Sequence, residues 1–465
     1  MRRIPGRWVS IFATLVILAG PQIVHADEVT DWNQTMLRAA LLGASSPTAT
    51  ARVAGLVHAA IYDAVNGVYH RYTPIFVDPA APGGASARAA AVQAAYVILS
   101  RQYGGTTGTP LVQQGILNNR RTVSLLEIIE DEGPGAVDSG VAWGQTVADA
   151  IWALLPDPTM GNFPDGNLPG QWRRTLNLPA PGTSTPSAGY LSLSTLTPWT
   201  MDLPTLISQF RPDPPPSLTS DRYTRDFNEV KKMGSYSSAF RTADQTVASL
   251  FWNSTSASYL WNGVALRLLE ARYRDEDDDD DHDWDGDDDS HRWHHGRHGS
   301  LLQNARFFGR LNVAISDAMV GCWDAKYAYA YWRPVTAIHL AADDGNPLTE
   351  PDTTWSPLFT TPSHPEYPSG HSCLSGAAAT VLADEFGERT RFTVESDTMI
   401  GEIRSFRSFR AALEEVKNAR IFAGIHFRTA CEVGTQLGAS IARFILENKF
   451  QRVDLVGWAG WPSST

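Results

Sequence analysis

The stretch that decides the fold is Lys326-Tyr-Ala-Tyr-Ala-Tyr-Trp-Arg333-Pro334. Seven residues make almost two turns of an α-helix, so Lys326 and Arg333 are expected to project from one helix face, and Pro334 to end the helix. Two cations are costly to bury without an anion, so the pair indicates an anion site; two charges on a solvated face are the alternative. The preceding residues predict a buried apolar stripe of Phe308, Leu311, Ile315, Met319 and Cys322.

A second stretch, Pro362-Ser-His-Pro-Glu-Tyr-Pro-Ser-Gly-His371, precedes an Ala- and Leu-rich segment that predicts a helix. Ser369, Gly370 and His371 are therefore expected at the start of that helix. Free backbone N–H groups and the positive end of the helix dipole suit a phosphate-like anion there, and Gly370 lets the backbone approach closely. A simple helix N-cap with an incidental histidine is the alternative.

The third stretch is Arg420-Ile-Phe-Ala-Gly-Ile-His426. Residues 409–419 predict an amphipathic helix with Arg420 near its end, and a further helix is expected from about Cys431 to Glu447. His426 falls at the Gly-containing break between the two helices. Taken alone, a histidine in apolar sequence is more often a core residue than a ligand.

The three stretches together supply the groups that would hold one tetrahedral oxyanion. Arginine forks bind its oxygens in pairs, lysine adds a point charge, and hydroxyl and backbone donors complete the shell. One imidazole can then act as a nucleophile or metal ligand while the other moves protons. The set comprises Lys326, Arg333, Ser369, Gly370, His371, Arg420 and His426.

Outside these stretches, apolar residues recur at helical spacing and strand-like alternation is scarce. We therefore expect an all-α fold of helical bundles with little or no β structure, built as one domain over residues 27–465, with its catalytic core at 301–448. Residues 161–216, rich in Pro, Gly, Ser and Thr, are expected to form an irregular connection. The clearest helical segments are Asp31–Leu42, Arg52–Val65, Ser86–Gln102, Val137–Leu155, Thr242–Asn253 and Trp261–Arg272.

An acidic, His-rich tract at residues 275–298 dominates the net charge. The whole chain carries −12, whereas twelve of the fifteen residues from Asp275 to Asp289 are Asp or Glu. Such runs usually repel themselves, which predicts a disordered insertion. The alternative is weak capture of Ca²⁺ or a transition metal, because Asp281, Asp283 and Asp285 match half of a calcium loop, although Arg292 stands where its bidentate Glu belongs.

Residues 1–26 have the features of a secretory signal peptide: early arginines, an apolar run too short for a membrane span, and Val24-His25-Ala26 at the cleavage position. We therefore expect a secreted or periplasmic protein without stable membrane insertion. No basic surface for nucleic acid is expected. The three cysteines, Cys322, Cys373 and Cys431, lie in apolar helical sequence and are expected to be small buried hydrophobes, with a role for Cys373 near the site as the minority alternative.

In this order, Lys-x6-Arg-Pro, Pro-Ser-Gly-His and Arg-x5-His resemble the signature of the type 2 phosphatidic acid phosphatase superfamily, which includes the vanadium haloperoxidases and several phosphatases. Three segments also look like its secreted bacterial haloperoxidase-like branch: residues 31–33, residues 58–63 and Trp323-Asp-Ala-Lys326. The resemblance implies vanadate bound by His426, proton transfer at His371, and peroxide polarised by Lys326. Hydrogen peroxide, a halide and a small organic acceptor are the implied partners, with assembly into a homo-oligomer left open.

The sequence leaves two enzyme activities of that superfamily open for this site, a phosphatase and a haloperoxidase. A phosphatase would use His426 as nucleophile with an aspartate four residues later, where this chain has Ala430; Glu432 or a distant acid are the candidate substitutes. Trp323 and His364 resemble the halide-pocket residues of vanadium bromoperoxidases, which favours a haloperoxidase using bromide or iodide rather than chloride. The alternatives are a secreted acid phosphatase and a non-enzymatic anion- or metal-binding protein.

Overall fold

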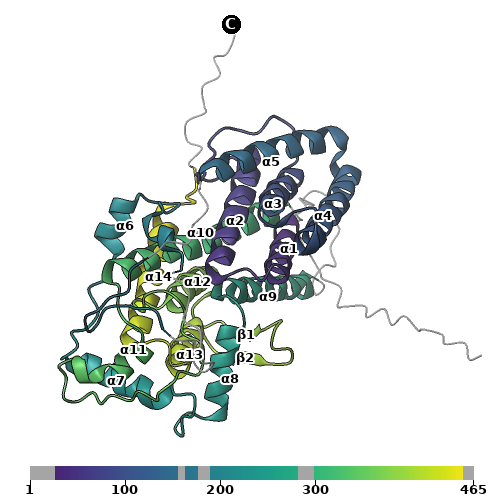
Figure 1. The fold of residues 1–465 in the computed structure, drawn as a ribbon. Helices are drawn as coiled ribbons and strands as arrows, with labels where there is room; N and C mark the ends of the chain where they lie inside the picture. Colours follow the sequence, from purple (N-terminus) through teal and green to yellow (C-terminus); the bar gives the residue numbers. More distant parts are fainter. Residues whose placement is uncertain (1–26, 155–162, 176–188, 281–297, 454–465) are drawn as a thin grey trace, which may run out of the picture.

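The computed structural model describes residues 27–154, 163–175, 189–280 and 298–453. Across these residues the architecture is helical, as predicted (Figure 1). The one sheet in the described ranges is a hairpin of β1 (Phe392–Glu395) and β2 (Ile403–Phe406), antiparallel with Phe392 opposite Phe406. None of the helices in this part of the chain is long and apolar enough to cross a membrane.

The first five helices form an N-terminal bundle (Figure 1). The Asp27 side chain caps the first helix in a capping box with Thr30, and the Ser46 side chain caps the second helix. His58 and Asn33 join these two helices through a buried hydrogen bond of 2.9 Å between His58 Nε2 and Asn33 Oδ1. The helices are α1 (Glu28–Leu42), α2 (Pro47–Tyr69), α3 (Ala87–Tyr103), α4 (Gly108–Glu132) and α5 (Pro134–Leu154).

The later helices build a second, C-terminal bundle around the long helix α10 (His298–Tyr329), which packs against α2 on one side and against α12 and α14 on the other. The predicted stripe along α10 is fully buried. The other elements are α6 (Leu203–Phe210), α7 (Asp221–Met233), α8 (Ala243–Ser254), α9 (Ala257–Asp280), α11 (Pro334–His339), α12 (Gly370–Phe386), α13 (Phe409–Phe422) and α14 (Arg428–Asn448), with short 3-10 helices η1 (Leu191–Thr195) and η2 (Ala341–Asp343).

Helices α12 and α14 lie in backbone contact because each has a glycine that faces the backbone of the other helix. A Cβ at Gly438 would overlap the carbonyl of Cys373, and one at Gly376 would overlap the carbonyl of Thr435. The Ser369 N–H also donates to the carbonyl of Ala430 across the two helices, at 2.9 Å. This close approach brings the start of α12 beside the start of α14, where two of the sequence motifs lie.

The structure departs from the sequence expectations in two connections. The stretch 161–216 contains α6 and η1, because the Asp202 side chain caps α6 through the Thr205 N–H and Pro204 suits its first turn. Helix α9 also continues to Asp280, into the acidic tract that was expected to be disordered. Residues 1–26, predicted to be a signal peptide, and residues 281–297 of the tract lie outside the described residues.

Candidate functional site

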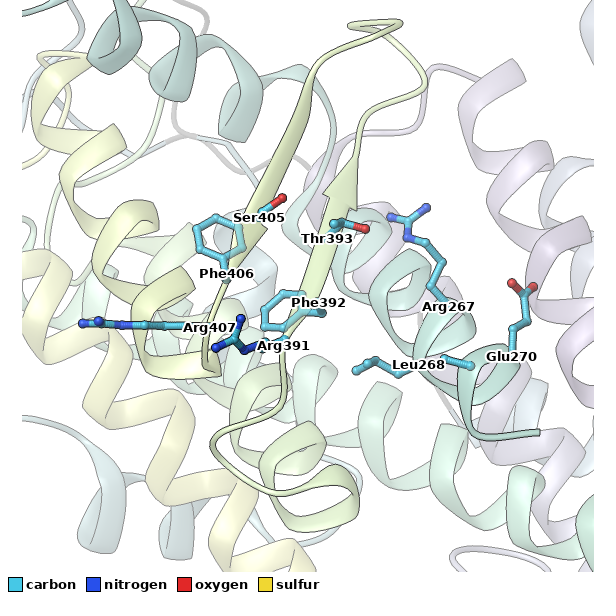
Figure 2. Close-up of a pocket in the computed structure, with 10 residues that line it drawn as sticks. Arg267, Leu268, Glu270, Arg391, Phe392, Thr393, Ser405, Phe406 and Arg407 are labelled. Atoms are coloured by element: carbon cyan, nitrogen blue, oxygen red, sulfur yellow. The ribbon is translucent and has the colours of Figure 1, made fainter. Parts of the chain in front are cut away.

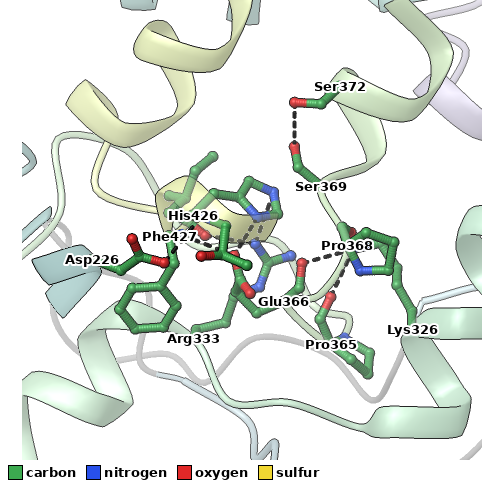
Figure 3. Close-up of polar contacts among 12 residues, drawn as sticks. Asp226, Lys326, Arg333, Pro365, Glu366, Pro368, Ser369, Ser372, His426 and Phe427 are labelled. Atoms are coloured by element: carbon green, nitrogen blue, oxygen red, sulfur yellow. Dashed lines mark hydrogen bonds and ion pairs between the residues drawn. The ribbon is translucent and has the colours of Figure 1, made fainter. Parts of the chain in front are cut away.

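The three sequence motifs meet at one end of the C-terminal bundle. Lys326 lies in the last turn of α10, Arg333 precedes α11, and Ser369 precedes α12. Arg420 lies in the last turn of α13, and His426 lies in the break before α14. Residues up to 100 positions apart thus come together, and Figure 3 shows several of them in mutual contact.

Lys326 is fully buried and its ammonium group holds the segment that leads into α12. Its Nζ donates to the carbonyl oxygens of Pro365 (2.9 Å), Glu366 (3.0 Å) and Pro368 (2.6 Å). Nζ also lies 5.7 Å from the ring centre of Trp323, within range of a cation–π contact. Burial lowers the pKa of Lys326 to about 8, because the charged form loses its hydration.

Arg333 does not share a helix with Lys326, which corrects the prediction from the seven-residue spacing. Helix α10 ends at Tyr329, Ala330 has a positive φ of 43°, and Arg333 is extended (ψ 155°) before Pro334 opens α11. A residue before proline is pushed out of the helical region, and proline at the first turn suits a new helix. The chain therefore turns, and Arg333 still reaches the site from its own element.

The guanidinium of Arg333 links the second and third motifs. Its Nε donates to the His364 carbonyl (3.0 Å) and one NH2 group to the Ile425 carbonyl (2.8 Å). The same NH2 group lies 3.2 Å from Nε2 of His426, and the other lies 3.1 Å from Nδ1 of His364. A guanidinium has only donors, so Nε2 of His426 must accept.

The opposite nitrogen of His426 faces a carboxylate that sequence reasoning did not single out. Nδ1 of His426 lies 2.8 Å from Oε1 of Glu366, and the same oxygen accepts the Phe427 N–H at 2.9 Å. Glu366 is fully buried, and burial raises its pKa to about 8 against the pull of Arg333. Glu366 lies inside the quoted second motif, between two prolines, which was the available signal. Glu432, one of the suggested substitutes, pairs with Arg222 instead.

Hydrogen-bond donors for an anion come from three further residues: Arg420, Ser369 and Gly370. Arg420 donates to Asn253 Oδ1 at 3.2 Å, while its buried Nε has no hydrogen-bond partner among the described residues. Ser369 is the N-cap of α12, but its hydroxyl accepts from the Ser372 side chain (3.2 Å) and not from a backbone N–H of the helix. A Cβ on Gly370 would come within 3.4 Å of the Trp323 ring, so the backbone passes close to the motif of α10.

His371 opens the first turn of α12 as predicted, and it is only partly buried. Its buried Nε2 lacks a hydrogen-bond partner within the described part of the chain. Burial, then Arg420 and Lys326, holds the pKa of His371 well below its usual range, and burial followed by Arg333 does the same for His426. Both imidazoles are therefore neutral near pH 7 and able to accept a proton or bind a metal.

Trp323 and His364 lie side by side, as their proposed pocket requires. Their ring centres are 5.1 Å apart, with the ring planes at 46°. Trp323 and Tyr327 both donate to the Gly189 carbonyl, at 3.3 and 2.8 Å, which fixes the aromatic wall. Trp323 is buried and His364 is only partly buried, so the His364 edge of this wall faces the accessible side of the site.

The three cysteines are buried and unpaired, as expected. Cys322 lies against the Pro368 carbonyl that also accepts from Lys326, with Sγ 3.7 Å from the oxygen. Among the described residues, no group of three or more His, Cys, Asp or Glu could hold a metal ion. The residues 281–297 of the suggested calcium-binding tract are not among them.

A large cleft of about 660 Å³ lies elsewhere, between α9 and the β-hairpin (Figure 2). Arg267, Phe392 and Phe406 are among its lining residues, and none of the lining residues belongs to the three motifs. A second cavity, of about 10 Å³, adjoins the site and is lined by Glu366 and Ala430, among others. The three motifs therefore lie away from this cleft.

Known proteins resemble this chain in sequence and in fold. Residues 306–454 match the family described as the VCPO second helical-bundle domain. Vanadium chloroperoxidase of Curvularia inaequalis is 25% identical over 393 residues, which are 72% of this chain. The match spans 60% of the length of that relative.

Solved structures agree at the level of fold. The first bacterial vanadium-dependent iodoperoxidase has a TM-score of 0.69 and 24% identity, covering 91% of this chain and 96% of its own. A holo-type bacterial vanadium-dependent chloroperoxidase has a TM-score of 0.60 and 16% identity, covering 92% and 93%. The fold of this chain, with its buried cluster of cations and imidazoles, therefore resembles that of the vanadium haloperoxidases. The family match over residues 306–454, the curated relative and the shared fold together support the vanadium haloperoxidase branch of the type 2 phosphatidic acid phosphatase superfamily.

Proposed function

We propose that this protein is a vanadium-dependent haloperoxidase that oxidises bromide or iodide with hydrogen peroxide to hypohalous acid. The observation that carries the proposal is the convergence of three buried cations and two neutral imidazoles at one site. Lys326, Arg333 and Arg420 are each at most 2% exposed. Such a concentration of charge is costly to bury unless an anion balances it.

The donors present fit vanadate. Arg420 Nε and His371 Nε2 are buried polar atoms without a partner among the described residues, and Nε2 of His426 offers a lone pair. We propose His426 as the metal ligand, with Lys326, Arg333, Ser369, the Gly370 N–H and Arg420 around the oxygens. When bound, vanadium(V) supplies a Lewis acid that polarises peroxide without itself changing oxidation state.

His371 is proposed to take a proton from the incoming peroxide. Its neutral state near pH 7 follows from burial and from the cations beside it, and its partial exposure places it toward the entry side. Lys326, held by three carbonyl oxygens, supplies a fixed positive charge for peroxide oxygen. We propose that the halide approaches along the wall of Trp323 and His364, whose aromatic surfaces suit a large, polarisable anion.

A phosphatase is the second candidate, and one contact favours it. A nucleophilic histidine needs a carboxylate that orients its ring, and Ala430 removes the expected one. Glu366 contacts His426 Nδ1 from another element, so His426 is oriented after all. The structural neighbours named above as vanadium peroxidases favour the first candidate.

The experiment that tests the proposal compares both reactions on one preparation. The purified protein is loaded with orthovanadate and assayed for iodide- and bromide-dependent halogenation of a phenol with hydrogen peroxide. The vanadate-free protein is assayed for hydrolysis of a phosphomonoester. Vanadate-dependent halogenation with little hydrolysis supports the haloperoxidase. Hydrolysis that vanadate inhibits would instead make the protein a phosphatase, and vanadate binding without either reaction would make it an anion-binding protein.

A further inference from the structure

The carboxylate that normally follows the last histidine of this superfamily by four residues is absent here, because that position is Ala430. Ala430 is 1% exposed, and its carbonyl accepts the Ser369 N–H. The nearby acid of α14, Glu432, is turned to Arg222 and does not serve His426. His426 would therefore lack an orienting acid if the third motif alone supplied the site.

Glu366 fills this role from the second motif. Its Oε1 accepts from Nδ1 of His426 at 2.8 Å and from the Phe427 N–H at 2.9 Å, so the carboxylate is fixed by two donors of the same turn. The Glu366 backbone is fixed as well: its N–H donates to the Tyr331 carbonyl at 3.0 Å, and its carbonyl accepts from Lys326. Figure 3 shows the carboxylate directed at the imidazole.

These contacts determine which nitrogen of His426 carries the proton. Arg333 can only donate, so Nε2 keeps its lone pair and the hydrogen lies on Nδ1, where Glu366 accepts it. A ligating histidine commonly needs this kind of outer partner, which fixes the tautomer and the ring orientation. The lone pair of Nε2 thus points toward Arg333 and accepts its hydrogen bond at 3.2 Å, so a bound metal ion would have to take the place of that bond.

Glu366 and Ala430 also border the same small cavity, of about 10 Å³. The second carboxylate oxygen, Oε2 of Glu366, has no hydrogen-bond partner in the part of the chain that the structure describes. An aspartate at position 430 would project into this space and compete with Glu366 for it. In this chain the acid that contacts His426 therefore comes from the segment before α12 and not from α14.

We propose that Glu366 is the positioning residue of His426, replacing the acid absent at Ala430, and that it presents Nε2 of His426 to the bound oxyanion. The inference rests on the proposed function in so far as the oxyanion is vanadate. The contact itself belongs to this chain in either of the two candidate functions.

The test measures tautomer and vanadate affinity, neither of which requires turnover. Histidine-labelled protein without vanadate is examined by long-range ¹⁵N–¹H NMR, with the His426 signals assigned from His426→Gln. Wild type should show a protonated Nδ1 and an unprotonated Nε2. Glu366→Ala should mix the tautomers and weaken orthovanadate binding by about 10- to 100-fold, the usual cost of losing such an outer partner. Glu366→Gln, which keeps an acceptor oxygen, should lose less than Glu366→Ala.

Two further variants separate positioning from mere folding. Glu432→Ala removes a neighbouring acid that faces Arg222, and its vanadate affinity should stay within about twofold of wild type. The double variant Glu366→Ala/Ala430→Asp restores a carboxylate beside the same cavity and should recover most of the affinity. No recovery would overturn the idea that the two positions are equivalent.

A folded Glu366→Ala protein with the wild-type tautomer and affinity would overturn the proposal itself. The two proposals fail separately. Wild-type protein that binds vanadate through the predicted tautomer without halogenating would overturn only the proposed function. Full halogenation by Glu366→Ala would overturn only the role of Glu366.

Discussion

Replacing Arg420 by methionine should make the protein more stable and at the same time unable to bind an oxyanion. Arg420 is 2% exposed, and its guanidinium donates to Asn253 Oδ1 at 3.2 Å, while its Nε has no partner among the described residues. A buried charge with so few partners destabilises the folded protein when no anion is bound. Methionine has a similar length, is apolar, and adapts to irregular space.

The size of the effect follows from the electrostatic cost of burial. Burial lowers the pKa of Arg420 from 12.5 to about 10, which corresponds to about 3 kcal/mol of preference against the charged form. The lost contact to Asn253 offsets about 1 kcal/mol. Arg420→Met should therefore raise the free energy of unfolding by about 1–3 kcal/mol, in line with other replacements of buried charges by apolar side chains.

Denaturant unfolding with and without orthovanadate measures both halves of the prediction. At a vanadate concentration of 100 Kd, wild type should gain about 2.7 kcal/mol, whereas Arg420→Met should gain almost nothing. Arg404→Met is the matched control, because Arg404 is well paired, with Glu415 at 3.0 Å and Asp244 at 2.6 Å. The control should be destabilised and keep its response to vanadate. An Arg420→Met protein less stable than wild type without vanadate would refute the reasoning.

Three further predictions concern separate parts of the molecule. His371→Ala should bind vanadate with nearly wild-type affinity and lose about 10²- to 10⁴-fold in halogenation turnover, as measured by steady-state kinetics, because it removes proton transfer and not the ligand. Burial lowers the pKa of Lys326 to about 8, so this residue loses its charge above that pH. The affinity for sulfate, whose own charge does not change near pH 8, should be constant below pH 8 and fall by up to about tenfold per pH unit above it. Lys326→Met should flatten this fall in calorimetric titrations. Replacing residues 281–297 by a flexible linker of equal length should leave vanadate affinity and halogenation within about twofold of wild type, and a loss of either would assign the acidic tract a role in the site.

Helical periodicity was sufficient to predict the bundles but not where the helices turn. Segments such as 52–65 and 409–419 were found as helices with ends extended by a few residues, because their apolar spacing and caps agree. The path after Lys326 was mispredicted, since counting residues assumed an unbroken helix. The turn at Ala330 depends on a positive φ, which could not be predicted because the residue there is an alanine and not a glycine or asparagine.

The composition of the site could be predicted, whereas its internal contacts could not. The cations and imidazoles stand in motifs whose spacing implies a common anion. Glu366 and His426 are 60 residues apart, and their contact depends on how the segment before α12 packs against the start of α14. That packing depends on glycines such as Gly438, whose role appears only when both helices are present.

The balance of charge explains why one site can serve two chemistries. In the described part of the chain, three buried cations lie at the site, and Glu366 is the carboxyl group that contacts His426, while burial, followed by the neighbouring charges, keeps His371 and His426 neutral. The oxyanion that fills this excess positive charge is selected by shape and charge, which vanadate and phosphate share. We therefore expect selection between peroxide chemistry and hydrolysis to lie outside the cation shell, beside the partly exposed His371 and His364. Substitutions in the cation shell should weaken every oxyanion alike, whereas substitutions beside these two histidines should change which reaction follows.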